Sequence, residues 1–158
     1  MERFLIRKPA QSETDVPSAL ANIFKLKSFR GKQLEIIELV MKNEDVLVLM
    51  PTGAGKSLIY QLPACISRGV TIVVSPLLSL IENQVDQLKR MNVKVASLSS
   101  QMSKRDRDGV ILDLKSKSPS TKLLYVTPEQ LKSTSFRTTL AAVHASGNIA
   151  RLVIDEAV

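Results

Sequence analysis

Short apolar runs alternate with longer amphipathic stretches along most of this chain. Runs of strand length occupy residues 45–50, 70–75, 93–98, 122–127 and 151–154. Stretches with the apolar spacing of helices lie before and between them, over residues 17–24, 32–43, 76–91 and 103–117, and after residues 55 and 127. Apolar strands that alternate with helices are typical of a parallel sheet with helices on both faces. The pattern therefore predicts an α/β fold of three layers.

Particular residues predict where these elements begin and end. Pro63 is expected to kink or end the helix that Lys56 begins. Ser103, Thr127 and Ser135 are candidate helix caps, and Gly147 is expected to end the last helix. Residues 1–16 are polar and mixed, so we expect a flexible N-terminal arm before a single domain over residues 17–158.

Composition narrows the classes of partner and site. The formal charge of +7 favours a polyanionic partner, above all nucleic acid. One cysteine, Cys65, cannot form an internal disulfide, which favours a reducing compartment. No apolar run has the length of a signal peptide core or a membrane span. His144 is the only histidine, so a zinc site built from this chain alone would lack ligands.

A glycine-bearing loop follows the first predicted strand and opens a predicted helix. Small residues there let backbone N–H groups turn toward a phosphate, and the helix N-terminus adds a partial positive charge. We expect Lys56 to reach the β- and γ-phosphates of ATP and the Ser57 hydroxyl to bind Mg²⁺. The alternative is an ordinary glycine turn with a chance lysine. The candidate cofactor-binding loop consists of Met50, Pro51, Thr52, Gly53, Ala54, Gly55, Lys56 and Ser57.

Two acidic residues follow the last apolar run. Parallel strands bind ligands at their carboxyl ends, so Asp155 and Glu156 are expected at the same sheet edge as Lys56. In that position the first acid would hold Mg²⁺ and the second would polarise the attacking water. The alternative is a pair of solvated acids. We predict that Lys56, Asp155 and Glu156 are catalytic, with Ser57 and Asp155 as the metal residues.

Five stretches in order resemble the motifs of RecQ-type ATP-dependent DNA helicases of superfamily 2. They are residues 29–33, 50–64, 73–81, 124–129 and 155–157. The amino-acid sequences of the loop and of residues 133–140 most resemble the fifth vertebrate RecQ branch. The resemblance implies a P-loop, RecA-like first helicase lobe that is incomplete here and ends in motif II. It also implies ATP and Mg²⁺ as cofactors and DNA as the partner, which the full-length parent would unwind in the 3′–5′ direction. It further implies a nuclear location if the source is eukaryotic and a cytoplasmic one otherwise.

The resemblance also implies roles for residues outside the loop. Gln33 would hydrogen-bond the adenine edge and Arg30 would pack against the base. Ser75, Pro76 and Thr127 lie in motifs that touch the DNA backbone. The alternatives are an exposed helix position for Gln33 and helix capping for Ser75 and Thr127.

The chain departs from the family pattern at several points. Leu26 stands where many RecQ proteins carry an aromatic residue that stacks on adenine, and Lys25 replaces the glycine beside it. Val158 replaces the histidine that couples hydrolysis to DNA in the family. The family's next strand lies between the loop strand and the motif II strand, and the second lobe carries an arginine finger; neither falls within residues 1–158. We therefore expect marginal stability and negligible hydrolysis.

Other functions remain open on the sequence alone. The chain could be a non-catalytic short isoform that binds nucleotide or a partner. It could be a piece of a DEAD-box-like RNA helicase, and a small P-loop kinase is a more remote reading. The basic residues Lys104, Arg105 and Arg107 are read as a solvated helix face rather than a DNA contact.

Overall fold

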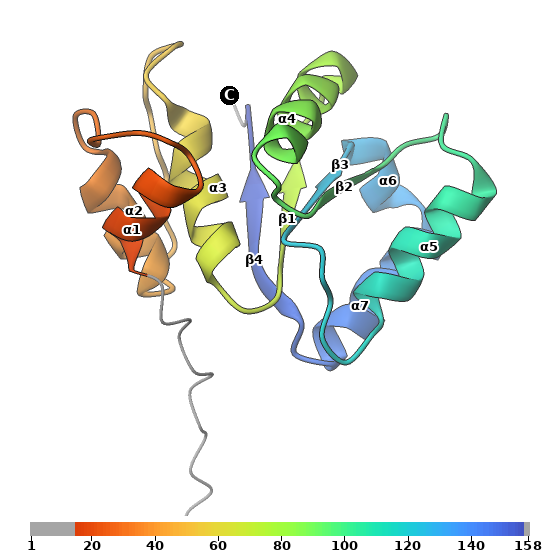
Figure 1. Ribbon diagram of the computed structural model, residues 1–158. Helices are drawn as coiled ribbons and strands as arrows, with labels where there is room; N and C mark the ends of the chain where they lie inside the picture. Colours follow the sequence, from red (N-terminus) through yellow and green to blue (C-terminus); the bar gives the residue numbers. More distant parts are fainter. Residues whose placement is uncertain (1–14, 157–158) are drawn as a thin grey trace, which may run out of the picture.

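Four parallel strands form one sheet within residues 15–156, the part of the chain that the computed structural model describes (Figure 1). The strands are β1 (Val70–Val74), β2 (Val95–Leu98), β3 (Leu123–Val126) and β4 (Ile149–Ile154), in the order β2-β3-β1-β4. All three pairings are parallel. The predicted α/β class is confirmed, and β1 is an interior strand between β3 and β4 with all five of its residues buried.

Helices cover both faces of the sheet, as the sequence pattern predicts. The first face carries α3 (Lys56–Ile66) and α4 (Leu78–Arg90) over Val73, Leu123 and Tyr125, and α1 (Val16–Asn22) and α2 (Gln33–Met41) pack against α3. The second carries α5 (Lys104–Leu114), α6 (Pro128–Lys132) and α7 (Thr134–Ala145), which pack over residues such as Ile72 and Leu124. Neighbouring strand residues point to opposite faces, which divides the core into these two clusters.

The predicted strand over residues 45–50 is wrong, because this segment is not paired with any described strand. Its Leu47 and Leu49 are 80% and 78% exposed. A cavity of about 910 Å³ lies between this segment and residues 150–156 of the β4 side. A strand needs a neighbour at hydrogen-bonding distance, and β4 is instead the edge of the sheet. The expected gap beside the motif II strand is therefore present.

Several element ends differ from the sequence predictions. Pro63 is accommodated inside α3, which continues to Ile66. The N-cap of α7 is Ser133, which accepts from the Phe136 N–H, and the prediction that Ser135 caps this helix is wrong. Ser103 caps α5 as predicted, and Gly147 follows α7 with a φ of 71°.

Two predictions concern the ends of the chain. Residues 1–14 of the predicted arm, and the departure at Val158, lie outside the described residues. The first helix, α1, begins at Val16, one residue before its predicted start, and Asp15 caps this helix by accepting from the Ser18 N–H. The domain boundary at residue 17 stays a prediction. No helix in residues 15–156 combines the length and the apolar character needed to cross a membrane.

We predict that the polypeptide of residues 1–158 is only marginally stable. Leu152 and Ile154 of the edge strand are 60% and 54% exposed, and the facing Leu47 and Leu49 gain little burial. Unpaired backbone and exposed apolar side chains both lower the free energy of unfolding. Circular dichroism should show unfolding below about 50 °C, near the low end of the range for mesophilic domains. A cooperative transition above that temperature would contradict the prediction.

The single thiol provides an independent measure of unfolding. Burial raises the pKa of Cys65 to about 11, so the folded chain carries less thiolate at pH 8 than a free cysteine does. Alkylation should therefore be slower in buffer than in urea, and its rate should rise through the thermal transition. Equal rates in buffer and in urea at low temperature would mean that this part of the core is not formed.

Candidate nucleotide-binding site

The glycine loop leads directly into the N-terminus of α3. The Ala54 N–H donates to the Pro51 carbonyl at 3.2 Å, which closes a turn, and Gly53 and Gly55 have φ values of 80° and 79°. Gly55 is the N-cap of α3 and makes no side-chain cap. The first N–H groups of a helix lack partners within the helix, so this loop end can accept an anion. The strand before the loop is absent, yet the predicted loop-to-helix geometry is present.

Gln33 joins the segment before α2 to this loop. Its Oε1 accepts from the Arg30 N–H at 2.8 Å, and its Nε2 donates to the Gly55 carbonyl at 3.0 Å. The side chain is only 3% exposed, so the alternative of an exposed helix residue is wrong. One amide hydrogen and one lone pair remain for a ligand. The adenine contact stays a prediction, and Gln33 also supports the phosphate loop itself.

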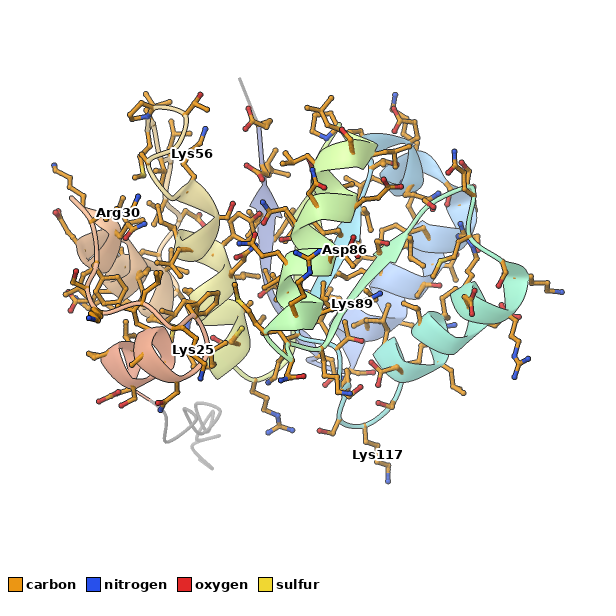
Figure 2. The ribbon with its side chains drawn as sticks, turned by 45° about the horizontal axis from the view of Figure 1, so that its top comes forward. Lys25, Arg30, Lys56, Asp86, Lys89 and Lys117 are labelled. Atoms are coloured by element: carbon orange, nitrogen blue, oxygen red, sulfur yellow. The ribbon has the colours of Figure 1, made fainter. Side chains whose placement is uncertain are left out.

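Near Gln33 in the sequence lie Lys25 and Leu26, two residues at which the chain departs from the RecQ pattern. Lys25 has a φ of 56°, the left-handed conformation that favours the glycine found there in the resembled family. Leu26 is 42% exposed. Arg30 is exposed, and Figure 2 shows it on the same side of the molecule as Lys56, with Lys117 far from both. Arg30 is therefore free to pack against a base.

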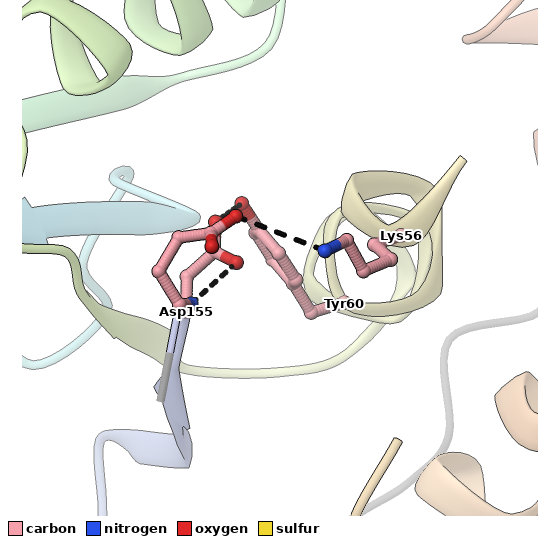
Figure 3. Close-up of polar contacts among 4 residues, drawn as sticks. Lys56, Tyr60 and Asp155 are labelled. Carbon is pink, nitrogen blue, oxygen red and sulfur yellow. Dashed lines mark hydrogen bonds and ion pairs between the residues drawn. The ribbon is translucent and has the colours of Figure 1, made fainter. Parts of the chain in front are cut away.

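The two acids of the last strand lie beside the start of α3. Pairing of β1 with β4 places them there, because the Asp155 N–H donates to the Val74 carbonyl at 2.9 Å. Lys56 Nζ lies 3.8 Å from Glu156 Oε1 (Figure 3). Both side chains are partly exposed, so the ion pair itself adds little stability. Its importance is that residues one hundred positions apart meet at one site, as predicted.

Tyr60 is a site residue that the sequence analysis missed. Its hydroxyl donates to Asp155 Oδ2 at 3.2 Å and lies 3.3 Å from the Tyr125 hydroxyl. Burial, with contributions from Tyr125 and Asp155, raises the pKa of Tyr60 far above its usual value, and burial likewise raises that of Tyr125. The available signal was spacing: Tyr60 is four residues after Lys56 and so shares its face of the helix.

The donors at this site suit magnesium. Asp155 offers a carboxylate and Ser57 a hydroxyl, and Ser57 is close enough to Tyr60 to influence its pKa. Oxygen donors of this kind are those that Mg²⁺ prefers, and it usually takes one or two from the protein and the rest from phosphates and water.

The predicted DNA contacts lie at the ends of β1 and β3. The Ser75 hydroxyl is buried without a hydrogen-bond partner, whereas Pro76 beside it is exposed. Thr127 is 8% exposed and is the N-cap of α6, but its side chain makes no capping bond. Side-chain capping by Ser75 is also not observed, since α4 begins after Leu77. Arg107 donates to the Ser99 carbonyl, while Lys104 and Arg105 are exposed as predicted.

Comparison with known proteins agrees with this arrangement. The family model for DEAD/DEAH box helicases matches residues 30–157. The chain belongs to the DEAD/DEAH box helicase family. Its match begins at Arg30 and covers the loop, the central strands and both acids of the candidate site.

Similar proteins include DNA helicases, one of them RecQ-like by name. The chain is 46% identical over 151 residues to ATP-dependent DNA helicase Q5 of Rattus norvegicus, covering 94% of this chain and 16% of that protein. It is 47% identical over 135 residues to the RecQ-like DNA helicase BLM of Xenopus laevis, covering 85% of this chain and 10% of that protein. The resemblance to RecQ helicases is confirmed, and the chain spans roughly one-sixth or less of these two relatives.

A solved structure has the same fold. It is described as a hypothetical ATP-dependent RNA helicase from Sulfolobus tokodaii, with a TM-score of 0.58 over 88% of this chain and 49% of that one. The two are 16% identical, so the likeness concerns the fold alone. It confirms the predicted RecA-like helicase architecture.

We predict that Gly55→Ala disrupts the site more than Gly53→Ala does. Both glycines have positive φ, which costs an alanine about 1–2 kcal/mol. A Cβ at Gly55 would also lie 2.3 Å from Gln33 Nε2, whereas one at Gly53 would meet nothing within 4 Å. Urea denaturation should therefore show a greater loss of unfolding free energy for Gly55→Ala.

The Gly53 variant is the matched control, because it carries the same change in a loop of the same conformation. Equal effects of the two substitutions would mean that the contact between Gln33 and the loop does not constrain the site.

Proposed function

We propose that this chain binds ATP with Mg²⁺ at the N-terminus of α3, as part of the motor of a RecQ-type DNA helicase. The observation that carries the proposal is the meeting of the glycine loop with the two acids, measured by the 3.8 Å separation of Lys56 Nζ and Glu156 Oε1. A glycine loop at a helix N-terminus, a lysine and two neighbouring carboxylates at one sheet edge are the elements that phosphoryl transfer requires.

Each residue has a role in the proposed site. Amides of the loop bind phosphate oxygens, and Lys56 moves from Glu156 to the β- and γ-phosphates when the nucleotide enters. Ser57 and Asp155 would hold Mg²⁺, which would neutralise phosphate charge when bound. Glu156, released from Lys56, polarises the attacking water. Gln33 and Arg30 bind the adenine.

The DNA-directed part of the function rests on the relatives and on charge. The parent protein would unwind DNA in the 3′–5′ direction, in the nucleus, with Ser75, Pro76 and Thr127 near the DNA backbone. The net charge of +7 favours such a partner. Buried Ser75 would have to act through a shift of the neighbouring chain or through its backbone.

A non-catalytic role is the second candidate for the polypeptide of residues 1–158. The exposed edge of β4 and the exposed segment of residues 45–50 leave the acids on an incompletely supported strand. Phosphoryl transfer also gains about 10³–10⁵ in rate from an arginine finger, which in the resembled helicases belongs to the second lobe. We therefore expect weak nucleotide binding and negligible hydrolysis by these residues alone.

Replacement of Lys56 tests the binding site. Lys56→Ala should weaken binding of a fluorescent ATP analogue at least about tenfold, because a charge-assisted contact to phosphate is lost. Lys117→Ala removes the same charge far from the loop and should leave binding unchanged (Figure 2). Undiminished binding by the Lys56 variant would show that the nucleotide site lies elsewhere.

Hydrolysis assays separate the remaining functions. ATP turnover stimulated by single-stranded DNA would support an active motor, and stimulation by RNA alone would support an RNA helicase. Nucleotide binding without turnover, the result we expect, supports the non-catalytic reading for this polypeptide.

A further inference from the structure

A line of buried polar groups runs from Asp155 into the interior between α3, β3 and α4. Tyr60 contacts Asp155, Tyr125 contacts Tyr60 at 3.3 Å, and Gln61 Nε2 contacts the Tyr125 hydroxyl at 3.1 Å. The same Nε2 donates to Gln84 Oε1 on α4. Tyr60, Gln61 and Tyr125 are 7%, 5% and 1% exposed, so water does not compete for these bonds.

The number of hydroxyl and amide hydrogens decides which group donates in each of these hydrogen bonds. The Asp155 carboxylate only accepts, so the single hydroxyl hydrogen of Tyr60 points to it. Tyr125 must then donate its own hydrogen to the Tyr60 oxygen. Gln61 has two amide hydrogens, of which one goes to Tyr125 and the other to Gln84. All the donors between Gln61 and the acid point toward Asp155, and hydrogen bonds in one direction strengthen one another.

The result is a carboxylate held at both oxygens. Oδ2 accepts from Tyr60, and Oδ1 accepts from the Glu156 N–H at 3.0 Å. The backbone of Asp155 is fixed in turn by its bond to Val74. Each carboxylate oxygen keeps a further lone pair, so the orientation is set without using up the groups that a cation would need.

We propose that Tyr60 is a positioning residue that orients Asp155 for Mg²⁺, and that Tyr125 and Gln61 direct its hydroxyl. This inference rests on the proposed nucleotide-binding function. Tyr60 acts through the carboxylate and does not itself touch the nucleotide. Groups that hold a metal ligand in place typically change metal affinity by about 10–100-fold when removed.

The test is the Mg²⁺ dependence of nucleotide binding by the polypeptide of residues 1–158. Tyr60→Phe keeps the ring and removes only the hydroxyl. The Mg²⁺ concentration at half-maximal enhancement of fluorescent ADP binding should rise about tenfold, while binding in EDTA stays the same. Tyr125→Phe should give a smaller shift in the same direction. Lys56→Ala, by contrast, should weaken binding with and without Mg²⁺.

Thr139→Val is the matched control for losing a buried hydroxyl. Thr139 is 4% exposed, donates to the Ser135 carbonyl at 3.2 Å, and lies on α7 on the opposite face of the sheet. Its Mg²⁺ titration should equal that of the wild type. An unchanged titration for Tyr60→Phe, or an equal loss with and without Mg²⁺, would overturn the proposal.

A second measurement does not depend on nucleotide. Three-bond couplings to the Asp155 carboxyl carbon, measured by NMR, report its χ1 rotamer. We expect couplings of a single Asp155 χ1 rotamer in the wild type and couplings averaged over several rotamers in Tyr60→Phe. Averaging already in the wild type, or no change in the variant, would refute the positioning role. If the wild type binds no nucleotide but the couplings behave as expected, the proposed function fails while the positioning of Asp155 by Tyr60 stands.

Discussion

The parallel pairing of β1 with β4 is the constraint on which the candidate site depends. It joins residues 70–74 to residues 149–154, and it places the two acids level with the end of the central strand. The bond from the Asp155 N–H to the Val74 carbonyl continues the ladder one residue beyond β4. Without this pairing, Lys56 and Glu156 would belong to unrelated parts of the surface. The chemistry of the site is therefore a consequence of strand order.

The loop and the segment before α2 depend on one another in a similar way. Gln33 is placed by Arg30 and in turn contacts the carbonyl of Gly55, so the predicted adenine side and the phosphate side share one amide. Two features favour glycine at position 55: its positive φ, and the close approach of the Gln33 side chain, which leaves no room for a Cβ. Sequence motifs that are twenty residues apart thus form a single structural unit.

The sequence predicts those features that are local or that follow from an apolar run. The strands β1 and β3 lie close to the predicted residues, because burial on both faces leaves a continuous apolar signature. The half-buried edge strand β2 and the helices nearby also lie close to their predicted residues. The segment of residues 45–50 carries the same signature and yet forms no strand, since pairing depends on a neighbour that no local pattern reveals. The cap of α7 was misplaced by two residues because Ser133 and Ser135 are equivalent candidates until the backbone turns.

The residues of the candidate site also differ in whether the sequence alone could predict them. Lys56, Asp155 and Glu156 could be predicted because their chemistry follows from their type and their position after a strand or loop. The role of Tyr60 could not, since its partners Asp155 and Tyr125 are 95 and 65 residues away. A tyrosine in an apolar helix is read as core packing, and only the fold reveals that its hydroxyl faces a carboxylate.

The open side of β4 also leaves room for pairing with another molecule in concentrated solution. Its outer backbone groups and the side chains of Leu152 and Ile154 form a template for a strand of another molecule. Self-association through this edge would bring copies together beside Asp155 and Glu156 and cover the cavity next to them. Light scattering that grows with protein concentration would thus accompany a gradual closure of the very site that nucleotide must enter.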